Sequence, residues 1–507
     1  MIFSENQILQ NPMQVFHNTA IDDTMKRTIL IALFLLPLLS HAQNCDCESH
    51  FRWVKDTFEE NDAGFTYALE QKGEYAYQVH NASFIKKIQD IQDADSCMAT
   101  IRDWLTFFRI GHFYLGTSNP RKTNSNIKQP DREAIIKAFR HEEKFNLDVD
   151  VFKSSLSRKK TPDFEGIWFS APYTVGIVKS GDDHIGFIIE GDGTYWSKNQ
   201  VKLRIKKDSS AVYYMRDHSE QLFRSTKLLG KNYLQTGFVT FKRLLPTFEP
   251  DPKIERHMTS MLSKTPFVEM SDGHTAYLRI PSFDGTLKPV IDSVIRVNKD
   301  LILNHPNLII DLRNNGGGSD RSYSEVLPIL YTNPIRTIGT AYLSTPLNNN
   351  RMLDFINDPS YGMTTAEKKW AKESYEKLEE KRGQFVNLDS TTLELTRYDT
   401  IYPFPKKVGI LINGNNGSTA EQFLLAAKQS QKVKLFGTTT AGVLDISNIH
   451  FVTSPCGDLT LGYSISKSMR IPYMAIDGKG IQPDYYIDSS IPDYQWIDFT
   501  QSILKTP

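Results

Sequence analysis

The residue best suited to nucleophilic chemistry is Ser418, which lies where an apolar segment meets a predicted helix. Segment 408–412 predicts a buried strand, a turn rich in Gly and Asn follows it, and a helix begins near Ser418. A hydroxyl at a helix N-terminus faces free N–H groups and the positive end of the helix dipole, which stabilise developing negative charge. Serine is equally common there as a simple helix cap. The local sequence leaves both interpretations open.

Four separated segments are more informative together than any one of them alone. They are 278–284 (LRIPSFD), 308–318 (LIIDLRNNGGG), 417–421 (GSTAE) and 478–484 (GKGIQPD). With these motifs the sequence resembles the C-terminal processing (tail-specific) serine peptidase superfamily, which includes the tricorn core protease and the retinoid-binding protein repeats. The resemblance spans roughly residues 266–490 and implies a ClpP/crotonase-like α/β catalytic core that hydrolyses peptide bonds.

The resemblance implies that Ser418 is the nucleophile, because the family's serine precedes x-x-Glu, as Ser418 precedes Glu421. The glycine-rich turn would lie opposite, so that Gly316 or Gly317 forms the oxyanion hole together with the N–H of Thr419. Glycine suits this task because the backbone must approach the substrate carbonyl closely. A plain tight turn is the alternative for these glycines. We expect the charged pair that precedes the glycines, Asp311 and Arg313, to brace the turn.

The general base is where this sequence departs from the best-known members. Those members place a lysine directly after a Thr-x-Gly turn, but here Gly442 is followed by Val443, which cannot accept a proton. In the tricorn-like branch the base is a histidine from a segment before the core, and run 104–115 (WLTFFRIGHFYL) resembles that turn. His112 is therefore the expected base, although Ile110 stands where the branch has an acidic residue. The alternative is a buried histidine at a helix end.

Asp477 is the expected partner of this base, because it matches the position of the acidic residue in the same branch. A carboxylate holds the tautomer of a catalytic histidine and stabilises its imidazolium. The alternative is a turn-forming Asp before Gly478. His274 and His450 are reserve candidates for the base. Three lysines do not occupy the family's lysine position: Lys428, Lys432 and Lys434.

The elements that must position these residues divide the chain into three expected parts after a leader. Residues 43–150 predict an N-terminal helical domain, 160–250 a β-rich domain of short alternating strands, and 262–500 an α/β catalytic core. The fold class is therefore α/β (α+β) and multidomain. Tail-specific peptidases carry a PDZ domain before the core. No carboxylate-binding loop of that type occurs here, so the β-rich domain is a possible PDZ replacement and recognition of free C-termini does not follow.

One charged segment inside the core, residues 364–382, predicts a helix. It opens with a capping box made by Thr364 and Glu367. We expect this helix to be a solvated insertion, with a lid over the cleft as the alternative.

The composition excludes partners that are held mainly by charge. The chain of 507 residues has 59 basic and 59 acidic side chains, so its formal net charge is zero, and we expect no nucleic-acid role. The His-Glu-x-x-His motif and paired Cys or His at zinc-site spacing do not occur. We therefore expect no metal and no organic cofactor.

A short apolar run near the start predicts export. Residues 29–39 are apolar, follow Lys26-Arg27 and precede small residues, which is typical of a signal peptide over residues 1–42 with cleavage after Ala42. Residues 1–24 fit a translation start assigned too far upstream of the signal peptide. The run is shorter than the roughly 20 residues that span a bilayer, so we expect no stable membrane anchor and a periplasmic or secreted protein. We also expect a disulfide between the N-terminal cysteines and Cys97.

These features predict a serine-type endopeptidase in which Ser418 attacks a peptide carbonyl and His112 transfers the proton. Two other classes stay open: a non-catalytic ligand- or peptide-binding protein on the same fold, and an esterase or amidase. The natural substrate and the oligomeric state are open as well.

Overall fold

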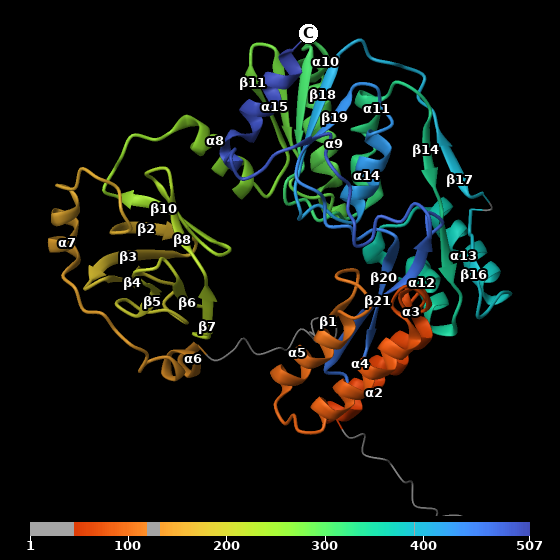
Figure 1. Cartoon of the computed structure of the whole chain (residues 1–507), viewed down its shortest axis with the longest axis horizontal. Helices are drawn as coiled ribbons and strands as arrows, with labels where there is room; N and C mark the ends of the chain where they lie inside the picture. Colours follow the sequence, from red (N-terminus) through yellow and green to blue (C-terminus); the bar gives the residue numbers. More distant parts are fainter. Residues whose placement is uncertain (1–44, 119–131, 390, 507) are drawn as a thin grey trace, which may run out of the picture. The chain divides into compact units, whose positions relative to one another are not determined.

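The computed structural model describes residues 45–118, 132–389 and 391–506 (Figure 1). The predicted signal peptide and most of the polar connection after residue 118 lie outside the described residues. Within the described ranges, no helix combines the length and the apolar character that a membrane crossing requires.

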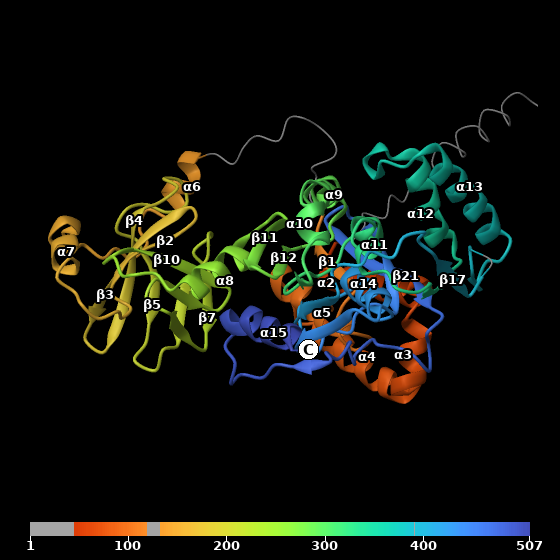
Figure 2. The ribbon, with the colours of Figure 1, turned by 90° about the horizontal axis from the view of Figure 1, so that it is seen from above.

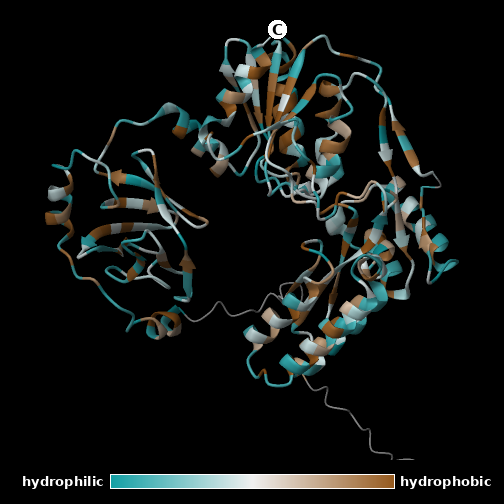
Figure 3. Cartoon of the chain, in the orientation of Figure 1, coloured by the Kyte–Doolittle hydropathy of each residue, from teal (hydrophilic) through white to brown (hydrophobic). Residues whose placement is uncertain are grey.

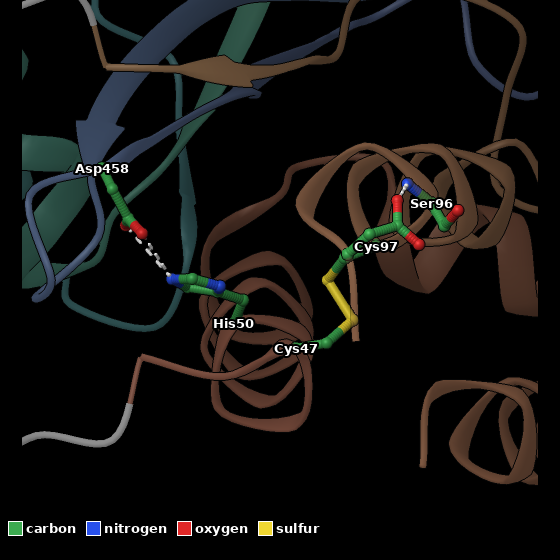
Figure 4. The surroundings of a disulfide bond; sticks show 6 residues. Cys47, His50, Ser96, Cys97 and Asp458 are labelled. Atoms are coloured by element: carbon green, nitrogen blue, oxygen red, sulfur yellow. Dashed lines mark hydrogen bonds and ion pairs between the residues drawn. A yellow bond between two sulfur atoms is a disulfide. The ribbon is translucent and has the colours of Figure 1, made fainter. Parts of the chain in front are cut away.

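The N-terminal part is helical, as its periodicity predicts. It consists of α2 (Cys47–Asn61), α3 (Phe65–Lys72), α4 (Glu74–Ile88) and α5 (Ala94–Leu105). A disulfide between Cys47 and Cys97 joins α2 to α5 (Figure 4), which confirms the expected pairing with Cys97. Phe51 and Phe58 of α2, together with Phe108, pack around Trp104 of α5, which is fully buried.

A five-stranded sheet connects these helices to the end of the chain. Strand β1 (Tyr114–Thr117) pairs antiparallel with β21 (Leu459–Ser468), and β21 also pairs with β20 (Ile446–Thr453) and β15 (Thr340–Leu343). Strand β16 (Phe385–Val386) completes the sheet. Leu461, Tyr463 and Ile465 of β21 are part of the same apolar core as α2 and α5. The loop between α5 and β1, which carries His112, is thereby fixed to the C-terminal strands.

Residues 132–262 contain a separate antiparallel sheet, curved and nearly closed like a barrel (Figure 2). Two short helices precede it, α6 (Arg132–Ala138) and α7 (Val149–Leu156), and α8 (Pro252–Leu262) follows it. The strands are β2 (Gly166–Ser170), β3 (Tyr173–Ser180), β4 (Asp183–Glu190), β5 (Val201–Ile205), β6 (Ala211–Tyr214), β7 (Glu220–Phe223), β8 (Thr226–Leu229), β9 (Tyr233–Thr236) and β10 (Val239–Leu245). The short alternating apolar runs of residues 160–250 thus predict a β-rich region correctly.

The α/β core is built on a second sheet. Its order is β11 (Phe267–Asp272), β12 (Thr275–Arg279), β13 (Asn307–Asp311), β18 (Lys407–Ile412), β19 (Val433–Gly437) and β22 (Tyr485–Tyr486). Every neighbouring pair is parallel except β11 with β12. The central strands β12, β13, β18 and β19 are buried on both faces, as the hydrophobic colouring within this sheet in Figure 3 reflects.

Helices cover both faces of the core sheet. Leu308 and Ile310 of β13 pack in one apolar cluster with α9 (Lys288–Val297), α10 (Lys299–Leu303), α11 (Leu327–Leu330) and α14 (Thr419–Ala427). Ile309, which points the opposite way, packs with α15 (Trp496–Lys505). Because successive side chains of a strand alternate, one apolar run serves both layers.

The insertion between β15 and β18 contains α12 (Pro346–Asn357) and α13 (Thr365–Glu379), with β14 (Ile335–Ile338) and β17 (Leu393–Thr396) paired beside them. Helix α13 begins with the capping box predicted from Thr364 and Glu367. Its surface is mostly hydrophilic (Figure 3), as expected for a solvated helix.

Candidate active site

Ser418 occupies the sharp turn between β18 and α14. It is the N-cap residue of α14, with φ 55° and ψ −126°, and its side chain makes no capping hydrogen bond. A non-glycine residue in such a sparsely populated region costs roughly 1–3 kcal/mol, and such strain clusters at functional sites. The helix-cap alternative is therefore wrong, because the hydroxyl is not used by the helix.

The backbone of this turn is held from two sides. The N–H of Ser418 donates to the carbonyl oxygen of Val443 at 2.9 Å, and the N–H of Gln422 donates to the carbonyl oxygen of Ser418 at 3.0 Å. The buried side chain of Asn416 donates to the carbonyl oxygens of Leu312 and Asn315 at 2.5 and 3.0 Å. The serine turn and the glycine-rich turn thus form one hydrogen-bonded unit.

The glycine-rich turn approaches Ser418 so closely that a side chain does not fit. A Cβ placed on Gly317, whose φ is 105°, would lie 2.9 Å from the Cβ of Ser418. The N–H of Gly317 donates to Asn315 Oδ1 at 3.0 Å, so this group is already used. The N–H groups of Gly316 and Thr419 donate to no acceptor among the described residues. Of the two predicted glycines, Gly316 has the available donor.

Asp311 and Arg313 brace this turn, as the sequence predicts. The buried Asp311 carboxylate accepts from the Tyr277 hydroxyl at 2.8 Å and from Arg313 at 2.6 Å, and Arg279 lies 3.5 Å away. Burial alone would raise the pKa of Asp311, but the two guanidinium groups outweigh it and lower the pKa to about 2. This carboxylate stays ionised and structural.

His112 lies in the loop before β1, also with a left-handed φ of 55°. Its carbonyl oxygen accepts from Arg109 and from Ser464, each at 2.9 Å. Its ring Nδ1 lies 2.5 Å from the carbonyl oxygen of Ile446, and a carbonyl can only accept, so Nδ1 carries the proton in this contact. In the neutral ring, the lone pair of Nε2 is then free.

Burial of the ring lowers the pKa of His112 below its ordinary value of 6.5, while the negative charge of Asp477 acts in the opposite direction. The effect of burial is the larger one, so the pKa of His112 lies below 6.5 and the ring is neutral near pH 7. A neutral imidazole with a free Nε2 can accept a proton.

Asp477 makes a different set of contacts from those expected of a triad carboxylate. It accepts from the N–H groups of Leu444 and Asp445, each at 2.6 Å, and from that of Ile446 at 3.1 Å. Asp477 therefore accepts its hydrogen bonds from the backbone, whereas the ring Nδ1 of His112 donates to the carbonyl oxygen of Ile446. Burial raises the pKa of Asp477. Asp477 fixes the loop whose carbonyl orients His112, and no sequence pattern signals that carbonyl.

Val443 packs against Gly417 and Gly111, the residues directly before the serine and the histidine. A Cβ on Gly417 would lie 2.6 Å from its side chain, and a Cβ on Gly111 would lie 2.9 Å from it. Glu421 holds this loop by accepting from the N–H groups of Gly442 and Val443 at 2.7 and 2.9 Å. No hydrogen bond joins Ser418 to His112 among the described residues. Catalytic hydrogen bonds often tighten only when substrate is bound.

The reserve candidates lie elsewhere. His274 is exposed in the turn between β11 and β12, and His450 is buried in β20 with its Nδ1 3.9 Å from Asp354. Lys432 donates to the carbonyl oxygen of Tyr402 at 2.6 Å, and Lys434 lies 3.6 Å from Asp484.

One group of side chains among the described residues has the proximity of metal ligands: His50, Cys456 and Asp458. Cys456 is disulfide-bonded, so it offers no thiolate, and His50 contacts Asp458 at 3.1 Å (Figure 4). This group does not have the composition of a metal site.

Comparison with known proteins identifies the core. Residues 274–487 match the family model described as Peptidase family S41. Residues 274–487, which make up the core of this chain, are thus similar to peptidase family S41. This similarity supports a hydrolase of the peptidase class. The matched range includes Ser418, the glycine-rich turn and Asp477, but His112 precedes it, so any contribution of His112 comes from outside the S41 core.

Solved structures with a similar arrangement include mature CPAF complexed with lactacystin, which is 14% identical, with a TM-score of 0.49 over 91% of this chain and 97% of that chain. A putative peptidase from Parabacteroides merdae is 11% identical, with a TM-score of 0.43 over 91% and 98%. The photosystem II D1 C-terminal processing protease is 12% identical, with a TM-score of 0.37 over 91% and 98%. No curated protein sequence matches the chain.

Proposed function

We propose that this S41 peptidase is a serine-type endopeptidase in which Ser418 is the nucleophile and His112 the general base. The observation that carries the proposal is the strained backbone of Ser418, whose hydroxyl does not cap the helix that follows. Strain of this kind turns a serine hydroxyl out of a strand-to-helix turn, toward a bound substrate. A serine that only stabilised a helix would need no such conformation.

The proposed chemistry is acyl transfer to water. The Ser418 hydroxyl gives its proton to His112 Nε2 as its oxygen bonds the peptide carbonyl carbon. The N–H groups of Gly316 and Thr419 then stabilise the oxyanion. His112 returns the proton to the departing amine when the C–N bond breaks, and water releases the acyl group by the reverse sequence. Asp477 acts as a positioning residue, since it holds the loop whose carbonyl orients the ring.

The test is labelling of the chain from Gln43 onward with a fluorophosphonate probe. We expect labelling of the wild type, none of Ser418→Ala, and strongly reduced labelling of His112→Ala. Ser502→Ala removes an exposed serine of α15 and serves as the matched control. A folded wild type that is not labelled would contradict the proposal and favour a binding protein on the same fold. Labelling with turnover of esters but not of peptides would favour the esterase alternative.

We also propose that the protein is exported. The apolar run at residues 29–39 and the Cys47–Cys97 disulfide both support this, because disulfides persist in oxidising compartments. Expression of the complete chain followed by N-terminal sequencing tests it. We expect a mature protein that begins at Gln43, and retention of the uncleaved chain in the cytoplasm would contradict export.

A further inference from the structure

A cavity of about 330 Å³ opens beside His112. Its walls come from α3, from the loop 106–112 and from two loops of the S41 core, 442–446 and 472–479. The volume is at the lower end of the roughly 300–1,000 Å³ typical of small-ligand pockets. A single large side chain of a substrate can occupy such a space.

The cavity is adjacent to the proposed nucleophile through one residue. Val443 forms part of its wall, and the carbonyl oxygen of Val443 accepts the N–H of Ser418. His112 forms another part of the wall. The turn 314–318 and Thr419 do not line it. The cavity therefore lies on the side of the proposed base and away from the proposed oxyanion donors.

The position of the cavity beside His112 determines which part of a substrate can reach it. When the tetrahedral intermediate collapses, the base returns its proton to the leaving amine, so that amine must lie within hydrogen-bond reach of the histidine. The substrate residue that carries the amine is the one directly after the scissile bond. Its side chain consequently reaches the cavity wall that His112 forms.

The character of the walls suggests which side chain fits. Apolar side chains dominate, among them Ala68, Ile110, Val443, Pro472 and Ala475. Ile110, which lines the cavity, is 71% exposed. A large apolar side chain that is exposed at a cavity favours binding of an apolar group, since a bound ligand removes it from water.

The charges around the cavity are mostly positive. Lys72, Arg109 and Lys479 line it, against the single lining carboxylate of Asp477. Arg109 is paired with the buried Asp62 at 2.6 Å, so the two lysines supply the remaining positive charge. The Asp477 carboxylate is occupied by three backbone N–H groups, and Lys479 is exposed to solvent. A second cation placed in this cavity would be repelled.

We propose that this cavity binds the side chain of the substrate residue directly after the scissile bond, and that it selects large apolar side chains over cationic ones. The inference rests on the proposed function of Ser418 and His112. It makes Gln71 and Lys479, which line the cavity from exposed positions, specificity-determining residues rather than catalytic ones.

The test is digestion of a proteome-derived peptide mixture, with the new N-termini identified by mass spectrometry and Ser418→Ala as the blank. We expect Leu, Phe, Met, Ile and Tyr to be enriched as new N-terminal residues and Lys and Arg to be depleted. In synthetic peptides that differ only at this residue, we expect kcat/KM for Leu to exceed that for Ala about tenfold.

Two variants locate the preference in the cavity. Gln71→Trp fills it from an exposed position, and we expect the tenfold preference for Leu over Ala to disappear. Lys479→Glu reverses one charge, and we expect kcat/KM for the Lys peptide to rise about three- to tenfold relative to the Leu peptide. Lys198→Glu, at an exposed turn before β5, is the matched control and should change neither ratio.

Cleavage with no preference at this residue, or with a preference for Lys or Arg, would overturn the inference and leave the proposed function standing. The same holds if both cavity variants keep the wild-type profile. If the wild type produces no peptides beyond the Ser418→Ala blank, the proposed function and the inference fall together.

Discussion

The turns that carry Ser418 and His112 have the same left-handed φ of 55°, but they are held in opposite ways. At Ser418 the backbone is fixed by Val443 and Gln422 while the side chain is not used by the helix. At His112 the side chain itself is fixed, through Nδ1, to the carbonyl oxygen of Ile446. A nucleophile must move onto a carbonyl carbon, whereas a base must keep one tautomer and one orientation.

The two turns also depend on different parts of the chain. The serine turn is fixed by the parallel sheet of the S41 core and by the buried side chain of Asn416. The histidine turn depends on the N-terminal helices, on the buried Asp62–Arg109 ion pair and on the pairing of β1 with β21. The S41 core alone thus contains the proposed nucleophile but not the proposed base, so the predicted effects of substitution differ between the two turns.

The largest effect is expected at the serine turn. Ser418→Ala should lower kcat by about 10⁴-fold or more, because removal of a nucleophile leaves only the oxyanion donors and substrate binding. The measurement is steady-state hydrolysis of a peptide found in the digestion experiment, with Ser502→Ala as control. Residual activity within tenfold of the wild type would show that another group attacks the substrate.

A smaller effect is expected at the histidine turn. His112→Ala should lower kcat by about 10²- to 10⁴-fold, the usual contribution of a general base. His274→Ala, which removes an exposed histidine, is the matched control and should leave kcat unchanged. Equal loss in both variants, or no loss in His112→Ala, would separate His112 from the chemistry.

The pH dependence of kcat/KM tests the roles of His112 and Asp477. Because burial lowers the pKa of His112, kcat/KM should fall on acidification with a midpoint below 6.5. The Asp477 charge raises that pKa, so Asp477→Asn should move the midpoint to still lower pH and lower kcat about tenfold by loosening the loop that orients the ring. A pH profile compared with that of Asp488→Asn, at an exposed carboxylate, measures both. A midpoint that moves upward would contradict the proposed geometry.

The smallest effect on activity is expected from removal of the disulfide that links α2 to α5. Replacing both Cys47 and Cys97 by Ser opens a link between residues 50 positions apart, which should lower the free energy of unfolding by about 4 kcal/mol. Below the unfolding temperature, kcat should fall only a few-fold, since β1 still pairs with β21. Thermal unfolding followed by circular dichroism, together with kcat at 25 °C, tests this. An unchanged melting temperature would contradict it.

Local pattern was sufficient for much of the fold. The alternating runs of residues 160–250 predict a β-rich region correctly, and the apolar segment 408–412 predicts β18, because burial of one or both faces of a strand determines which positions are apolar. The capping box at Thr364 and Glu367 likewise marks the start of α13. The pairing of β1 with β21 joins residues more than 300 positions apart, and no local pattern records it.

The sequence alone determined the family motifs, the turn that carries Ser418 and the choice of Asp311 and Arg313 as a brace, since these depend on residue types at short spacing. Only the tertiary structure decided that Ser418 does not cap its helix, that the N–H of Gly317 is already used, and that Ile446 rather than Asp477 accepts from the His112 ring. Hydrogen bonds of the backbone are available to every residue type. The folded geometry therefore selects them, and the order of side chains does not.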